Sequence, residues 1–210
     1  MASKDREYRN MDIRIEIREE GAEPSFFVEG YASTFQPYVL MTIDDTDYSE
    51  RIEPNAFDGA DMSDVVFRVD HQGPVYARTS AGSVEVWTDE HGLAMRADLG
   101  RTHRSRELFA DIEAGNYPQM SFAFSVAEDH YDKATHTRII DRIAKVYDVS
   151  PVVFPANPTT ELSVSTRDYF NGVIEAEKAE RLEEERRERQ KQKIRILLEV
   201  SKHGNQDHDY

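Results

Sequence analysis

The segment Gln119-Met120-Ser121-Phe122-Ala123-Phe124-Ser125-Val126 alternates large side chains with small ones. Successive side chains of a β-strand point to opposite faces, so one face of this segment can pack a core while the other carries only serine and alanine. The pattern therefore predicts a core strand. Ser121 would stand on a rigid backbone with nothing bulky beside it, open to a substrate carbonyl. A lone serine in a strand is more often structural, so a catalytic role depends on partners elsewhere.

A candidate base comes from the segment Val65-Val66-Phe67-Arg68-Val69-Asp70-His71. It also alternates, and its odd-numbered residues share one apolar face that His71 ends. We expect this strand to stop before Gly73-Pro74, because glycine and proline interrupt strands. A histidine at that point can act as a neutral base near pH 7. Taken alone, a histidine at such a position is more often a satisfied core residue.

A candidate acid lies in the segment from Ile143 to Ser150, which predicts a third strand. Asp148 shares a face with Ala144, Val146 and Ser150, and a carboxylate in such surroundings needs a hydrogen-bond donor. Ser121, His71 and Asp148 together provide a nucleophile, a base and an orienting acid. Acyl-transfer chemistry requires this combination on rigid elements.

Six motifs in fixed order carry a family resemblance. They are Glu29-Gly30-Tyr31-Ala32, Ile52-Glu53-Pro54-Asn55-Ala56-Phe57, Asp70-His71, Gly92-Leu93, Ser121-Phe122-Ala123-Phe124, and Asp148-Val149-Ser150-Pro151-Val152-Val153-Phe154-Pro155-Ala156-Asn157-Pro158. The ordered set resembles the signatures of the prohead (procapsid maturation) serine proteases of tailed bacteriophages. The resemblance covers residues 12 to 166.

The resemblance implies a fold similar to the herpesvirus maturational proteases: an α+β, mainly β protein built on a closed or nearly closed antiparallel β-barrel with surrounding helices. It implies a serine endopeptidase that cleaves the major capsid protein, the scaffold and itself inside the immature shell. It also implies Ser121, His71 and Asp148 as the catalytic residues, with no cofactor and no metal. The herpesvirus enzymes gain activity on dimerising, so a homodimer is a further expectation.

Two positions depart from the family pattern. The family usually has glutamate where Asp148 stands and glycine where Ala123 stands. Because aspartate is shorter than the family's glutamate, the resemblance does not decide which residue is the third member of the triad. The competing candidates are Asp70, His91, Asp141 and Glu161. By analogy with an arginine-bearing loop of the herpesvirus enzymes, a loop around Asp141-Arg142 is expected to help bind the oxyanion.

Composition narrows the classes of function. The formal net charge of −15 disfavours binding to nucleic acid, which depends on basic patches. The absence of cysteine excludes disulfides and thiolate catalysis, in agreement with a reducing host cytoplasm. No apolar leader and no window long enough for a membrane span is present. We expect a protein that stays in the host cytoplasm, is packaged within the prohead and has no membrane partner.

Three parts are expected along the chain: a flexible N-terminus over residues 1–11, a protease domain over 12–166, and a charged helical tail over 167–210. Thr102 predicts the start of a short helix that runs through Leu108, Phe109 and Ile112 and ends at Gly115. The tail helix is polar all round in its middle and has an apolar cluster from Ile194 to Val200. Such a tail is either a solvated helix or a targeting segment that docks on the scaffold or the inner shell.

Three other interpretations remain. The first is a catalytically inactive β-barrel that serves as a scaffold- or capsid-interaction module. The second is a metal hydrolase, although the histidines lack close ligand pairs. The histidines in question are His71, His91, His103, His130 and His136. The third is a serine enzyme with a nucleophile other than Ser121. Its candidates are Ser150, Ser163 and Ser165.

Overall fold

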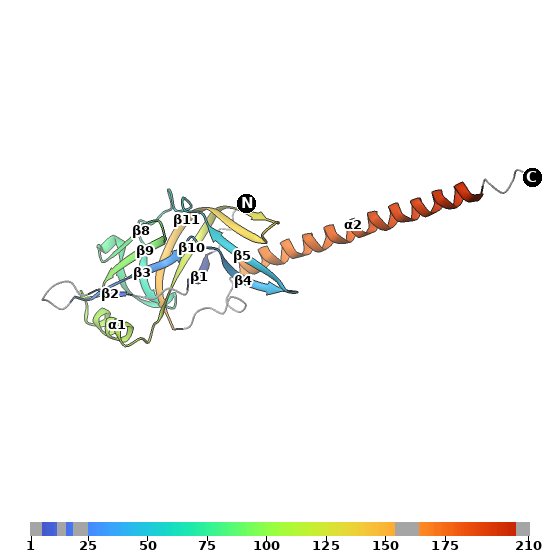
Figure 1. Ribbon diagram of the computed structural model, residues 1–210. Helices are drawn as coiled ribbons and strands as arrows, with labels where there is room; N and C mark the ends of the chain where they lie inside the picture. The colour runs from blue at the N-terminus through green and yellow to red at the C-terminus, as the bar shows by residue number, and fades with distance from the viewer. Residues whose placement is uncertain (1–5, 12–15, 19–24, 154–163, 205–210) are drawn as a thin grey trace, which may run out of the picture. The chain divides into compact units, whose positions relative to one another are not determined.

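A computed structural model describes residues 6–11, 16–18, 25–153 and 164–204. The chain divides into two compact units, Met1–Thr166 and Arg167–Tyr210. Strands make up most of the first unit, and the second unit contains most of a long charged helix (Figure 1). An α+β, mainly β protein was predicted, and the structure confirms this class.

The described residues contain eleven strands, two α-helices and one short 3-10 helix. In chain order they are β1 (Glu7–Met11), β2 (Glu16–Arg18), β3 (Phe27–Thr34), β4 (Tyr38–Ile43), β5 (Thr46–Ile52), β6 (Val66–Val69), β7 (Gln72–Arg78), η1 (Thr79–Ala81), β8 (Val84–Thr88), β9 (Gly92–Asp98), α1 (His103–Glu113), β10 (Gln119–Asp132), β11 (Thr137–Val152) and α2 (Val164–Gly204).

The larger sheet is organised around the two longest strands, β10 and β11. Its order is β1-β10-β11-β5-β4, and β6 joins β11 and pairs in turn with β7. Strand β11 is antiparallel to β10 and parallel to both β5 and β6. The first part of β11 pairs with β5 and its last part with β6. This is possible because β11, with 16 residues, is long enough to pair with two shorter strands one after the other. The β6–β7 hairpin is therefore placed beside the end of β11.

The described strands do not support the predicted barrel. They form two separate sheets, and the second has the order β2-β3-β9-β8. Both sheets contribute to one hydrophobic core, which includes Val28 and Met95 from the smaller sheet and Phe122 and Ile143 from the larger one. Alternation within a segment predicts that it forms a strand, but closure depends on which distant strands pair.

The predicted short helix is present as α1. Thr102 caps its N-terminus, and the Thr102 hydroxyl accepts a hydrogen bond from Ser105 N at 3.0 Å. Leu108 and Phe109 are buried in the common core. The helix therefore closes one side of the core of the first unit.

The N-terminus differs from the prediction. Residues 7–11 were expected to be flexible, yet they form β1 and pair antiparallel with β10. The local sequence gives no strand signal, because Glu7 and Arg9 are charged residues on a strand that lacks apolar alternation. Both are almost completely buried against opposite charges from distant parts of the chain.

Candidate active site

Strand β10 supplies the predicted serine. The large residues of the segment belong to the core, as expected, but the small-residue face is not open. Ser121 has no exposed surface, and Ser125 is nearly as buried. The expectation that substrate can approach Ser121 freely is wrong for this structure. The Ser121 hydroxyl lies between His71 and the main chain of β1.

His71 lies in a tight turn and not at the end of a strand. Strand β6 ends at Val69, which pairs with Gln72 at the start of β7, so Asp70 and His71 form a two-residue hairpin loop. Their φ angles are 45° and 57°, both in the left-handed region. Two-residue hairpins prefer turns of this kind because their twist matches that of the strands. This turn could not be predicted from the sequence, because two-residue hairpin loops usually contain glycine and Asp70-His71 does not.

Contacts with β11 hold this turn in place. Asp70 N donates to Pro151 O at 3.2 Å, and Val153 N donates to Asp70 Oδ1 at 3.3 Å. His71 N donates to Ser150 Oγ at 3.3 Å. Residues other than glycine in the left-handed region cost about 1–3 kcal/mol each and persist where surrounding contacts fix them. The strained turn therefore sets the position of the imidazole.

The structure brings the three predicted side chains together. His71 Nε2 lies 2.6 Å from Ser121 Oγ, and His71 Nδ1 lies 2.5 Å from Asp148 Oδ1. Both are hydrogen-bonding distances, so the imidazole connects the hydroxyl to the carboxylate. The side chain of His71 is 14% exposed and that of Asp148 is 1% exposed. The ion pair or hydrogen bond between them is therefore shielded from solvent.

The register of β10 and β11 explains this convergence. Ser121 is opposite Ser150, and Ala123 is opposite Asp148. Ser121 and Asp148 are thus diagonal neighbours on one face, about 7–8 Å apart at the backbone. That gap is too wide for a direct bond between the two short side chains. The imidazole of His71 spans it, and the methyl group of Ala123 leaves room.

Ser150 takes a position that the sequence analysis missed. Its hydroxyl donates to Asp148 Oδ1 at 2.9 Å and accepts from His71 N, so it contacts both partners of the acid–base pair. The sequence could have predicted this contact, since Asp148 and Ser150 are two residues apart and therefore share one face of the strand. Asp148 Oδ2 is buried and has no hydrogen-bond partner among the described residues.

The other candidate acids lie elsewhere. Asp141 Oδ2 bonds to His130 Nδ1 at 2.6 Å on the exposed end of the β10–β11 ladder. Asp70 accepts from Val153 N, and His91 is close to Asp89 in the turn before β9. Glu161 lies outside the described residues. Of the described candidates, Asp148 is the one bonded to His71.

The expected oxyanion loop is not a loop. Asp141 and Arg142 lie within β11, and the exposed Arg142 side chain pairs with Glu128 at 2.5 Å. Glu128 follows Ser121 by seven residues on β10, a separation of about 20 Å along a strand. Arg142 is therefore too far away to bind an oxyanion formed at Ser121.

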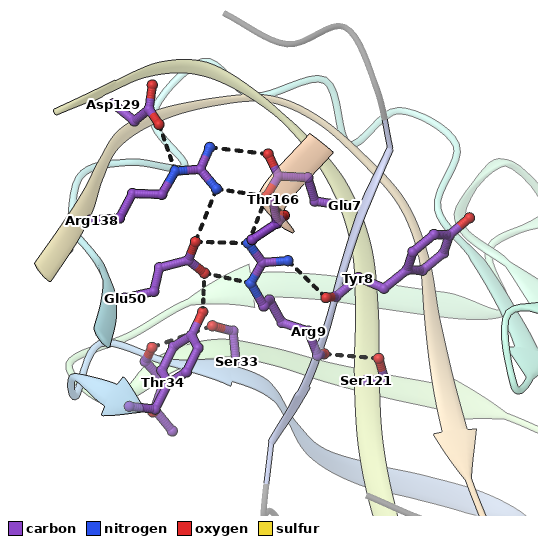
Figure 2. A network of polar contacts seen from close by, with 11 residues as sticks. Glu7, Tyr8, Arg9, Ser33, Thr34, Glu50, Ser121, Asp129, Arg138 and Thr166 are labelled. Carbon is purple, nitrogen blue, oxygen red and sulfur yellow. Dashed lines mark hydrogen bonds and ion pairs between the residues drawn. The ribbon is translucent and has the colours of Figure 1, made fainter. Parts of the chain in front are cut away.

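A buried cluster of charges lies next to Ser121 (Figure 2). Arg9 bonds to Glu50 at 2.5 Å and to Glu7 at 2.6 Å, and Arg138 bonds to the same two acids. These four side chains are at most 4% exposed. The Thr166 hydroxyl donates to Glu7 at 2.9 Å. Two acids and two bases thus pair inside the protein, and Arg138 also bonds to the partly exposed Asp129 at 2.5 Å.

The cluster shifts the acid–base equilibria of its members. Burial alone would raise the pKa of Glu7, but the charges of Arg9 and Arg138 outweigh this and lower it to about 2. Burial likewise opposes the charge of Arg9, yet Glu50 and Glu7 hold its pKa well above the usual value. Tyr38 donates to Glu50, and burial raises the pKa of Tyr38. Glu7, Arg9 and Arg138 therefore stay charged at neutral pH.

The described part of the chain has neither a cluster of metal ligands nor a membrane-spanning helix. No group of three or more His, Cys, Asp or Glu side chains there is arranged to hold a metal ion. No helix among the described residues is long and apolar enough to cross a membrane.

Comparison with known proteins identifies a family. Residues 12–173 match the family described as Caudovirus prohead serine protease. No curated protein and no solved structure matches the chain.

Proposed function

This chain belongs to the caudovirus prohead serine protease family, and we propose that Ser121, His71 and Asp148 are its catalytic triad. The observation that supports this most directly is the pair of short contacts from the two ring nitrogens of His71 to the other two side chains. The family implies a location within the viral prohead and capsid or scaffold proteins as substrates.

In the proposed mechanism, Ser121 Oγ attacks the carbonyl carbon of the scissile peptide while His71 Nε2 takes the hydroxyl proton. His71 then gives this proton to the leaving amine, and the C–N bond breaks to leave an ester on Ser121. Water attacks the ester by the same path, with His71 as base and then as acid towards Ser121 Oγ. The product acid is released and the hydroxyl is restored.

Asp148 has an electrostatic role in this scheme. It accepts a hydrogen bond from His71 Nδ1, fixes the orientation of the ring and offsets the positive charge of the imidazolium. Its burial strengthens this effect, because few water molecules screen the pair. Ser150 positions the carboxylate and the main chain of His71.

Co-expression with the cognate major capsid protein tests the proposal. Wild-type protein should shorten the capsid protein and itself, as read by intact-mass analysis, and Ser121→Ala should leave both uncut. Ser125→Ala is the matched control, because Ser125 is buried on the same strand and does not contact His71. Cleavage that persists in Ser121→Ala and stops with a chelator would refute the serine assignment. Uncut protein in every sample would favour the inactive interaction module.

We also propose that the end of α2 directs packaging. Ile194, Leu197 and Leu198 are 52%, 68% and 57% exposed, and their spacing places them on one face of the helix. A chain that ends at Asp168 should cleave normally in solution but be packaged less efficiently into proheads. Equal packaging of the two chains, measured by quantitative mass spectrometry of purified proheads, would contradict a targeting role.

A further inference from the structure

Strand β1 lies along the part of β10 that carries the proposed nucleophile. The register places Asn10 opposite Ser121, Arg9 opposite Phe122 and Tyr8 opposite Ala123. The other edge of β10 is already paired with β11. An extended peptide that reaches Ser121 by adding a strand to this sheet would have to pair with the same edge of β10. In this structure β1 occupies that edge.

The main chain of β1 also contacts the nucleophile directly. Ser121 Oγ donates to Arg9 O at 2.8 Å, and the same oxygen lies 2.6 Å from His71 Nε2 (Figure 2 shows the contact with Arg9). A serine hydroxyl has one proton to donate. When that proton points to Arg9 O, it is not directed to the base that must remove it. The contact with β1 therefore competes with activation of the hydroxyl.

The orientation of this contact makes β1 a poor substrate. Attack requires Ser121 Oγ to approach a carbonyl carbon, with the carbonyl oxygen turned to other donors. Arg9 instead presents its oxygen to the hydroxyl. The side chain of Tyr8 also covers the base, because its ring packs on that of His71 with a centroid separation of 4.6 Å. With these contacts in place, Ser121 is completely buried.

The charge cluster holds β1 in place but permits its departure. Glu7 and Arg9 are the members of the cluster that β1 supplies. Their removal takes away one negative and one positive charge, and Arg138 remains paired with Glu50 at 3.1 Å and with Asp129 at 2.5 Å. Stranding a single buried charge would cost about 3–5 kcal/mol, whereas the loss of a neutral pair strands none. The departure of β1 therefore leaves no buried charge of the cluster without a partner.

We propose that β1 occupies the place of the substrate strand, and that proteolysis requires β1 to leave so that an extended substrate segment can pair antiparallel with residues 119–124 of β10. This inference rests on the proposed function, because it assigns the substrate edge and the regulation of the same site. The substrate class is a peptide segment that is free to adopt an extended strand. Such a segment and β1 cannot pair with this edge of β10 at the same time, so one excludes the other.

A reversible disulfide tests the proposal. The chain has no cysteine, so the double variant Tyr8→Cys/Ala123→Cys contains one possible intramolecular bond, between residues directly opposite each other. Facing strand residues have the Cα separation that a disulfide needs. The probe is a fluorophosphonate, which phosphonylates the serine oxygen and loses fluoride and the hydroxyl proton. The mass of the protein reports both disulfide formation and labelling.

Labelling of the oxidised variant should be almost abolished relative to the same variant after reduction, because the disulfide removes the open state. A chain that lacks residues 1–11 should be labelled about 10- to 1,000-fold faster than wild type, since minor open states typically have populations of about 0.1–10%. Equal labelling rates of the oxidised and reduced variant at Ser121 would overturn the inference and leave the proposed function intact. Absence of labelling at Ser121 in all forms, the reduced variant included, would instead refute the proposed function.

Discussion

Asp148 and Ser150 lie two residues apart on β11, and the Ser150 hydroxyl donates to Asp148 Oδ1 at 2.9 Å. The same hydroxyl accepts from the main chain of His71 at 3.3 Å. One side chain therefore links the strand that bears the acid to the turn that bears the base. It has no contact with the reacting atoms, so Ser150 is a positioning residue.

Ser150→Ala should lower kcat for cleavage of the major capsid protein by about 10- to 100-fold with little change in KM, because it leaves a buried N–H without its acceptor and removes one donor to Asp148. Ser150→Thr keeps the hydroxyl and should recover most of the rate. Steady-state kinetics of the three proteins check this. A change confined to KM, or no recovery with threonine in a folded protein, would contradict the positioning role.

Asp148→Asn should reduce kcat by about 10⁴-fold, because the amide can hold His71 in the wrong tautomer and carries no charge to offset the imidazolium. Asp141→Asn, the same change seven residues earlier on β11, should leave kcat unchanged, since Asp141 bonds to His130. Circular dichroism and thermal unfolding would show whether both variants fold. Comparable losses in the two variants would mean that Asp148 has no special role.

Asp70→Val should lower the free energy of unfolding by about 1–3 kcal/mol and slow catalysis, because a β-branched residue fits poorly at a φ of 45° and cannot accept from Val153 N. Asp70→Asn should match wild type in both measurements, since asparagine tolerates this conformation and retains an acceptor oxygen. Urea denaturation and fluorophosphonate labelling of Ser121 give the two readouts. If valine is tolerated as well as asparagine, the turn is not under strain.

Stability should fall in acid because of Glu7. Its pKa is about 2 in the folded protein against an ordinary value of 4.5, so the folded state binds this proton less readily than the unfolded state. The stabilisation, about 3 kcal/mol, is therefore complete above pH 4.5 and is lost as the pH falls toward 2. Urea denaturation across this range should give a steep slope for wild type and a flatter one for Glu7→Gln. Glu90→Gln, at an exposed position, should follow the wild-type slope; parallel slopes for all three would exclude Glu7 as the source.

The local sequence predicted a large part of the site. The alternation over residues 119–126 identified the β10 strand and assigned its large residues to the core. The two-residue period of β11 put Asp148 and Ser150 on one face. These predictions depend on side-chain direction within a few residues, which the backbone geometry of a strand fixes by itself. The order of the family motifs then led to the correct family.

The turn at Asp70-His71 could not be read in the same way. Its residues take positive φ angles only because Pro151, Val153 and Ser150, about 80 residues later in the chain, hold them there. The same reason explains the misplaced oxyanion loop, since strand pairing in the second half of the chain decides whether Asp141 and Arg142 lie in a loop.

The sequence by itself determined the strands that carry Ser121 and Asp148, which face of each is apolar, and the residue types available for acyl transfer. Only the tertiary structure decided that the strands form two separate sheets and that β1 pairs with β10, where Arg9 O meets a hydroxyl 112 residues away. The buried pairs of Glu7 with Arg138 and of Arg9 with Glu50 give the charges that β1 buries their opposite partners. Side-chain periodicity is a property of short segments, whereas sheet order and charge pairing depend on partners that are distant in the chain.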